Sequence, residues 1–443
     1  MGAPRRRLLL ACFIALTMLV ALAPSAATAL ASAPAARTPG EGRLPAKPSA
    51  ARRSKGSAPY PVQVVSDGSG FCALMSNGRV YCWGSNTVIN GGVSQGLLGA
   101  GSKASFSKIP LEVKGLTGAT SLVSDQAGYC AVLKNGTVRC WGSDGTGGSI
   151  GHGWLGNGVR SGSSYVPVPV LGVTDVTALV SDGAGYCALL RSGHVMCWGL
   201  DAGILGDGSS GYFAPLTQST AVRVIDLPDA VSLAGSNSGS YFDSYCATLA
   251  TGPLKCWGRI GSSVASVPVV VHGVLRPTDI VVGDGSGYGL VAGQVKCWFS
   301  KSLPAFTVAG VANVTQLAGD GSTDCALLLS RRAQCWSMTG ASPLHPHPRY
   351  ATGFAGATSL AAGGHCALFA DGRANCLGLG TTATRKPVPT LSHITSITYG
   401  ATGYCALAQE HRTWQWGYLS NPDSNVPFVL QRSPVAVVFP PGP

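Results

Sequence analysis

Cysteine is the residue type in this sequence whose spacing points most directly to chemistry. Twelve of the fifteen cysteines fall into six pairs, each with ten residues from the first cysteine to the second. The pairs are Cys72 with Cys82, Cys130 with Cys140, Cys187 with Cys197, Cys246 with Cys256, Cys325 with Cys335, and Cys366 with Cys376. A structural zinc site needs four ligands, usually from closely spaced pairs, whereas each of these segments offers only two. The spacing therefore favours disulfides over metal binding.

A β-hairpin places the two members of a pair opposite each other. In a hairpin centred on Asn77, Cys72 faces Cys82. If Met75 and Arg79 close the loop with hydrogen bonds, the cysteines occupy a non-hydrogen-bonded site, where Cα atoms approach to roughly 4.5 Å. That distance is within disulfide reach. We therefore predict six disulfides, each inside one hairpin.

Three cysteines lie outside this pattern. Cys12 lies in a segment that we expect to be removed. Cys297 is expected to face Gly289 in a hairpin that is two residues shorter, and Cys405 is expected to face Gln415. Because these two thiols belong to different repeats and to opposite strands of the hairpin, we predict that both are free and buried.

Acidic residues precede five of the hairpins in Ser-Asp or Gly-Asp loops. They are Asp67, Asp125, Asp182, Asp284 and Asp320. Repetition should place them around one rim of the molecule, where carboxylates could contact a partner or bind calcium. The alternative is an Asx turn, in which the Asp side chain caps its own backbone before a glycine. We favour the turn and keep the five residues as candidate binding residues.

Aromatic residues in the long loops are a second set of candidates. Seven tryptophans recur at one position of the repeat and are expected to be core. Four loop aromatics differ from them: Trp154, Tyr165, Tyr212 and Phe213. Loop aromatics on a rigid scaffold are suited to a protein or glycan surface. The eight histidines are scattered and there is no G-x-S-x-G, so we predict no enzyme, no catalytic residue, no cofactor and no metal.

The elements that position these residues are repeated eight times. Each repeat contains a phrase such as Tyr186 to Gly199 (YCALLRSGHVMCWG), in which two β-prone runs flank a polar turn. The phrases begin at Phe71, Tyr129, Tyr186, Tyr245, Tyr288, Asp324, His365 and Tyr404. A strand-like run precedes most hairpins, and another follows. Three or four short strands per repeat, apolar on both faces, are what a propeller blade requires.

The two ends of the repeated region favour a closed ring over a straight solenoid, which would need distinct polar caps. Val62–Val65 opens the region without a preceding strand, and Val435–Phe439 closes it without a following hairpin. We expect these two fragments to share one blade. The predicted fold is an all-β propeller of seven or eight blades with disulfides inside the hairpins.

The segment from Cys187 to Gly199, followed by the G-x-L-G-x-G phrase at 203–208, resembles the regulator of chromosome condensation repeat. Weaker copies extend the resemblance from about Tyr60 to Phe439. Members of this family are usually seven-bladed, and their best-known activity is nucleotide exchange on a nuclear GTPase, a partner that an exported chain would not meet. The fold also resembles that of secreted bacterial propellers that inhibit β-lactamases through loops on one face.

The N-terminal region has the three-part organisation of a secretory signal peptide. Arg5–Arg7 precede an apolar run from Leu8 to Ala23, and Ala27–Ala29 form an A-x-A cleavage site. We predict a signal peptide over 1–29, a disordered basic linker rich in Pro and Ala over 30–59, and a single propeller domain over 60–443. After signal removal we expect no membrane span.

Charge is concentrated before the propeller. The linker carries a net charge of +5 and the signal +3, so subtraction from the total of +12 leaves about +4 for the body. The sequence of the body shows no cluster of basic residues of the kind that binds nucleic acid. We predict a secreted, extracellular monomer that binds a protein partner or a cell-envelope component. The alternatives are a glycan-binding, lectin-like propeller and an enzyme on the same scaffold.

Overall fold

A computed structural model describes most of the chain after residue 57. The described residues are 58–87, 94–125, 127–145, 153–160, 162–209, 217–236, 244–283, 285–320, 323–337, 346–377, 385–388, 391–400, 403–420 and 428–440. The predicted signal peptide and nearly all of the predicted linker lie outside this part. So do the candidate residues Tyr212, Phe213 and Asp284.

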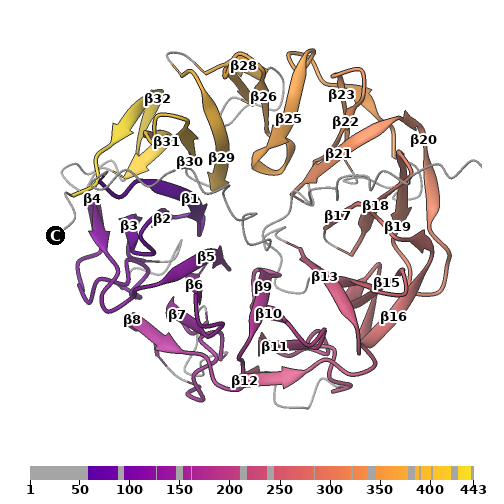
Figure 1. Ribbon diagram of the computed structural model, residues 1–443, viewed down its shortest axis with the longest axis horizontal. Coiled ribbons are helices and arrows are strands. Elements are labelled where there is room, and N and C mark those ends of the chain that lie inside the picture. Colours follow the sequence, from indigo (N-terminus) through magenta and orange to yellow (C-terminus); the bar gives the residue numbers. More distant parts are fainter. Residues whose placement is uncertain are drawn as a thin grey trace, which may run out of the picture. The chain divides into compact units, whose positions relative to one another are not determined.

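The described residues form eight antiparallel sheets of four strands, arranged as blades around a ring (Figure 1). Blade 1 contains β1 (Pro61–Ser66), β2 (Gly70–Met75), β3 (Val80–Ser85) and β4 (Phe106–Glu112). Blade 2 contains β5 (Ala119–Ser124), β6 (Gly128–Leu133), β7 (Val138–Gly142) and β8 (Ser164–Pro169). Blade 3 contains β9 (Val176–Ser181), β10 (Gly185–Leu190), β11 (Val195–Leu200) and β12 (Thr217–Arg223). Blade 4 contains β13 (Ala230–Gly235), β14 (Ser244–Leu249), β15 (Pro253–Ile260) and β16 (Ser263–Leu275).

The second half of the ring repeats this order. Blade 5 contains β17 (Asp279–Val282), β18 (Gly287–Val291), β19 (Gln294–Trp298) and β20 (Phe306–Ala312). Blade 6 contains β21 (Val314–Gly319), β22 (Asp324–Leu328), β23 (Ala333–Trp336) and β24 (Arg349–Tyr350). Blade 7 contains β25 (Ala357–Ala361), the short 3-10 helix η1 (Ala362–Gly364), β26 (Cys366–Phe369), β27 (Ala374–Leu377) and β28 (Arg385–Pro387). Blade 8 contains β29 (Ile394–Gly400), β30 (Gly403–Ala408), β31 (Thr413–Ser420) and β32 (Phe428–Val437). The propeller prediction is confirmed, with eight blades.

The hairpin of the two middle strands has the predicted register in the blades that carry a cysteine pair. In blade 1 the amide of Met75 donates to the carbonyl of Arg79 at 2.9 Å, which closes the loop as expected. Cys72 and Cys82 are then paired across the hairpin with their Cα atoms 4.1 Å apart.

All six predicted disulfides are present, and each joins the second and third strands of one blade. Their Cα separations are 4.0 to 4.1 Å, slightly below the expected 4.5 Å. Besides the bond in blade 1, the bonds join Cys130 to Cys140, Cys187 to Cys197, Cys246 to Cys256, Cys325 to Cys335, and Cys366 to Cys376. These cysteines therefore hold hairpins together and are not available as metal ligands or reactive thiols.

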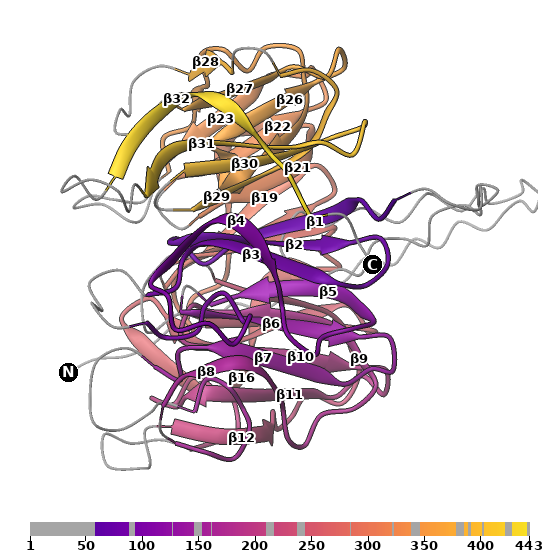
Figure 2. The same ribbon diagram turned by 90° about the vertical axis from the view of Figure 1, so that its left-hand side faces the viewer.

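Ring closure differs from the prediction. Each blade is one continuous stretch of chain, so β1 and β32 belong to different blades and share no sheet. Blade 1 instead meets blade 8 through side chains, with β1 beside β29 and β30 (Figure 2). The indole Nε1 of Trp83 donates to Oε1 of Gln415 at 2.7 Å, and Phe439 packs edge-on against Trp83. The shared-blade prediction was wrong because the last strand completes its own four-stranded sheet.

Blade 5 contains a second departure. Its hairpin turns through only two residues, Ala292 and Gly293, with φ angles of 49° and 76°. A two-residue turn shifts the register by one, so Cys297 faces Tyr288 and not Gly289. Cys297 and Cys405 are both free and buried, as predicted. Burial raises the pKa of the Cys297 thiol to about 12, so this thiol is protonated and unreactive at neutral pH.

Candidate functional site

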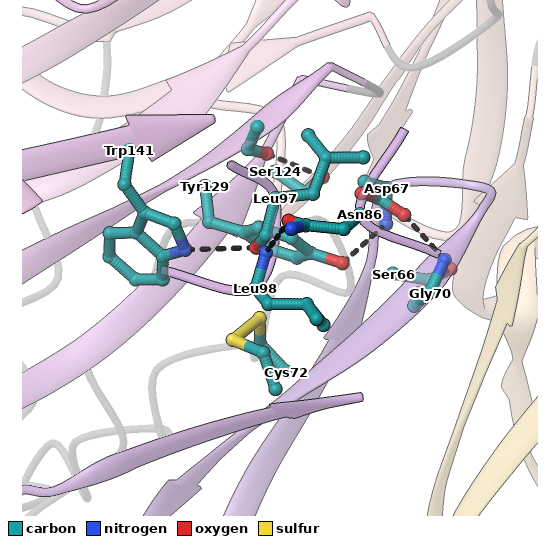
Figure 3. Close-up of a disulfide and its surroundings, with 12 residues drawn as sticks. Ser66, Asp67, Gly70, Cys72, Asn86, Leu97, Leu98, Ser124, Tyr129 and Trp141 are labelled. Carbon is teal, nitrogen blue, oxygen red and sulfur yellow. Dashed lines mark hydrogen bonds between the residues drawn. A yellow bond between two sulfur atoms is a disulfide. The ribbon is translucent and has the colours of Figure 1, made fainter. Parts of the chain in front are cut away.

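Three of the predicted Asp residues are buried in turns at one rim. This rim, which we call the loop rim, carries the loops between the first and second strands of each blade. Oδ1 of Asp67 accepts a hydrogen bond from the amide of Ser69 at 2.8 Å. It accepts another from the amide of Gly70 at 2.6 Å (Figure 3). Asp125 and Asp182 cap their loops in the same way. Their exposures of 0 to 2% exclude contact with a partner, so they are turn residues.

Each of these carboxyl groups also lies against a tyrosine of the next blade. The amide of Asp67 donates to the Tyr129 hydroxyl at 3.2 Å (Figure 3). Tyr186 lies beside Asp125 in the same arrangement, and its proximity lowers the pKa of that carboxyl. Burial has the larger, opposite effect and raises the pKa of Asp67 to about 6 and of Asp125 to about 7. These Asp–Tyr contacts join neighbouring blades.

The repeated tryptophans make a second joint between blades. Nε1 of Trp141 in blade 2 donates to the carbonyl of Leu97 in blade 1 at 3.1 Å (Figure 3). Leu97 lies in the first G-x-L-G-x-G phrase. Trp198 in blade 3 donates to the carbonyl of Trp154 in the second phrase at the same distance. The phrases therefore receive the indole of the following blade.

Trp154 and Tyr165, the two described loop aromatics that we named as candidates for a protein or glycan surface, are not openly exposed. Trp154 is 2% exposed and belongs to the hydrophobic core, because its loop folds inward to meet Trp198. Tyr165 is half-buried, and its hydroxyl donates to the carbonyl of Ser94 in the neighbouring blade at 2.6 Å. The two aromatics observed are parts of joints between blades and do not form a free surface.

Asp320 is the exception among the described Asp candidates. Its Oδ2 lies 2.6 Å from Nε2 of His365, and the two side chains remain 25% and 15% exposed. His365 follows η1 and begins the seventh hairpin phrase, where most blades carry tyrosine. The Asp320–His365 contact therefore occupies the place of the Asp–Tyr contacts, with an imidazole in place of a phenol. The ring of Tyr399 in blade 8 stacks on His365, with centroids 4.6 Å apart.

We call Asp320, His365 and Tyr399 the loop-rim cluster. It draws on three consecutive blades, and sequence reasoning identified only Asp320. The signal for His365 was its position at the start of a repeat phrase, where it replaces tyrosine. The Asp320 carboxylate orients the imidazole, so the cluster can offer hydrogen bonds and an aromatic face to a partner.

Two features of the described residues bear on other functions. No group of three or more His, Cys, Asp or Glu side chains in this part of the chain is arranged to hold a metal ion. Among the same residues, no helix has the length and apolar character needed to cross a bilayer.

Comparison with known proteins identifies the repeat. The model of the regulator of chromosome condensation (RCC1) repeat matches residues 64–88, in blade 1. No curated protein matches the sequence significantly. The solved structure of human WBSCR16 is similar, with a TM-score of 0.55 and 16% identity over 82% of this chain and 94% of that chain.

Two yeast structures are also similar. Prp20p from Saccharomyces cerevisiae has a TM-score of 0.50 and 16% identity over 69% of this chain and 87% of its own. Yeast RCC1 (Prp20) bound to Kap60 has a TM-score of 0.51 and 16% identity over 88% and 90%. At these identities the likeness is one of fold. The chain is therefore an eight-bladed β-propeller whose first blade matches the regulator of chromosome condensation repeat.

Proposed function

We propose that this protein is an exported, non-enzymatic propeller that recognises a protein partner or a component of the cell envelope. One observation carries the proposal. Among the described residues, the repeated Asp, Tyr and Trp side chains mostly join one blade to the next, whereas the loop-rim cluster departs from the repeat and remains partly exposed. A rigid ring with distinctive rim residues is the usual arrangement of a recognition scaffold.

Two further observations support the proposal. The solved structure of Prp20p concerns its binding to Gsp1p and histones, so this fold is used for protein recognition elsewhere. Six disulfides inside hairpins fit an oxidising compartment, as does the signal-peptide grammar of residues 1–29. The glycan alternative loses its main support, because Trp154 is buried.

The test is capture of a partner from culture supernatant and envelope extract with the exported protein as bait. We expect His365→Ala or Asp320→Ala to weaken capture about tenfold, the loss caused by removing roughly 1.4 kcal/mol of contact energy. Arg160→Ala is the control, because Arg160 is an exposed residue outside the loop-rim cluster. It lies in the loop that leads into the fourth strand of blade 2. Melting curves of each variant verify folding. Capture of no partner, or equal capture by all variants, would contradict the proposal.

A further inference from the structure

The rim opposite the loop rim carries the hairpin turns, and blade 6 departs from the others there. Four hairpins have arginine at the first position after the turn: Arg79, Arg332, Arg373 and Arg412. Three of these form ion pairs: Arg79 with Glu112 at 2.7 Å, Arg373 with Asp371 at 2.6 Å, and Arg412 with Glu410 at 3.5 Å. Arg332 lacks such a pair among the described residues. Its guanidinium lies over the ring of Tyr350, 3.7 Å from the centroid, closer than Arg373 lies to the ring of Phe369 at 5.6 Å.

The stacking on Tyr350 leaves the guanidinium of Arg332 able to bind an anionic ligand. A guanidinium on an aromatic face keeps its charge and its in-plane N–H donors, which match the two oxygens of a carboxylate. Arg331 precedes it in the turn and is exposed. Neither arginine forms an ion pair with a carboxylate among the described residues. The positive charge is therefore available.

Arg331 also occupies an unfavourable backbone position. Five hairpins place glycine at the last position of the turn: Gly78, Gly136, Gly193, Gly252 and Gly372. All five have positive φ, which glycine adopts without strain. Arg331 holds φ at 59°, in the left-handed region that side chains disfavour, and His411 at the matching position of blade 8 holds φ at 61°.

Exposed apolar side chains lie in the same turn and on the paired strand of blade 6. Leu329, at the first position of the same turn, is 73% exposed, and Tyr350 is 53% exposed. Exposed arginine and aromatic side chains are enriched where protein interfaces form. Resting on the proposed recognition function, we propose that the blade-6 corner (Leu329, Arg331, Arg332 and Tyr350) docks an acidic segment of the protein partner with an apolar residue beside its carboxylates.

A peptide fits this surface better than a nucleic acid or an anionic polysaccharide. Phosphate contacts would use the arginines alone and leave Leu329 exposed to water. A segment that alternates acidic and apolar side chains satisfies both parts of the corner. Its carboxylates pair with the guanidinium groups, while its apolar side chain covers Leu329.

The experiment measures binding by fluorescence anisotropy with the exported protein. The probe is a short labelled peptide that alternates glutamate and leucine, and a version with glutamine in place of glutamate is the comparison. We expect the acidic peptide to bind more tightly, and Arg332→Glu to weaken it about tenfold or more. Arg373→Ala removes the paired arginine at the matched position of blade 7 and should change affinity less than about twofold.

The Arg331→Gly variant distinguishes a loss of peptide binding from a loss of folding. It restores the residue found in five other turns and relieves the positive φ, so the melting temperature should not fall while peptide affinity drops. Leu329→Ser should also weaken the peptide. Equal losses for Arg332→Glu and Arg373→Ala, no preference for the acidic peptide, or stronger competition by a DNA duplex would each overturn the proposal.

The partner capture described above distinguishes this inference from the proposed function. A partner that is captured equally by the wild-type protein and by Arg332→Glu contradicts docking at the blade-6 corner and leaves the proposed function intact. A partner that is lost with Arg332→Glu and retained with Arg373→Ala supports both.

Discussion

Replacing Asp67 with asparagine should stabilise the protein at alkaline pH and have little effect at acidic pH. Asparagine retains the side-chain oxygen that accepts the amides of Ser69 and Gly70. It removes the ionisable group, which is buried and lies against Tyr129 of the next blade. The substitution therefore isolates the cost of burying a carboxylate at a joint between blades.

The size of the effect follows from the pKa of Asp67, which burial raises from 3.8 to about 6. Well below pH 4 the carboxyl is neutral in both the folded and the unfolded state. Between pH 4 and pH 6 the folded state holds a proton that the unfolded state has lost, so stability falls as pH rises. Above pH 6 the full cost is present, at most about 3 kcal/mol at roughly 1.4 kcal/mol per pKa unit.

We therefore expect Asp67→Asn to be about 1 to 3 kcal/mol more stable than the wild type at pH 8, and nearly equal to it at pH 4. Urea denaturation followed by tryptophan fluorescence, with the disulfides intact, measures this difference. Asp371→Asn is the control, because Asp371 is exposed and Arg373 lowers its pKa. That control should show no gain in stability at pH 8.

Two results would refute this reasoning. A stability difference between Asp67→Asn and the wild type that stays constant from pH 4 to pH 8 would show that ionisation of Asp67 is not linked to folding. A variant that is less stable at pH 8 would show that the carboxylate's hydrogen bonds outweigh the cost of its burial.

Four further variants test the joints and the disulfides by chemical denaturation. Replacing Cys187 and Cys197 with serine should lower the free energy of unfolding by about 2 to 3 kcal/mol, and no loss would show that the hairpin is already held in the unfolded state. Gly156→Ala should cost about 2 to 4 kcal/mol, because the added methyl meets the Trp198 indole at 2.8 Å. Gly162→Ala, with open space and φ of 88°, should cost about 1 kcal/mol, and equal costs would contradict the contact argument. Gln415→Leu removes the acceptor of an indole across the ring closure and should cost about 1 to 3 kcal/mol, whereas an unchanged stability would show that this bond is dispensable.

The disulfides and the propeller fold were predictable because the interactions that specify them are local. Cys187 and Cys197 are ten residues apart, and the turn between them sets the register that brings them together. Eight similar phrases then required eight similar hairpins. The register failed only where the turn itself changed, in blade 5, since a loop of two residues and a loop of three place Cys297 opposite different partners.

The candidate site was predicted only in part. Asp67 and Asp320 have the same loop position in their repeats, yet one is buried and the other is partly exposed beside His365. The difference lies in the residue that the next blade supplies, which is Tyr129 in one case and His365 in the other. Loop sequence alone does not reveal that neighbour, because it lies 45 to 62 residues further along the chain.

The sequence by itself determined the repeat, the hairpins, the six cysteine pairs and the two free thiols, because these depend on turns and on spacings of about ten residues. Only the tertiary structure decided that Trp154 is core and that closure occurs through Trp83 and Gln415. It also decided that Arg332 stacks on Tyr350 and has no ion pair within the described part of the chain. The physical reason is that burial and charge pairing depend on the side chains brought alongside by neighbouring strands and blades.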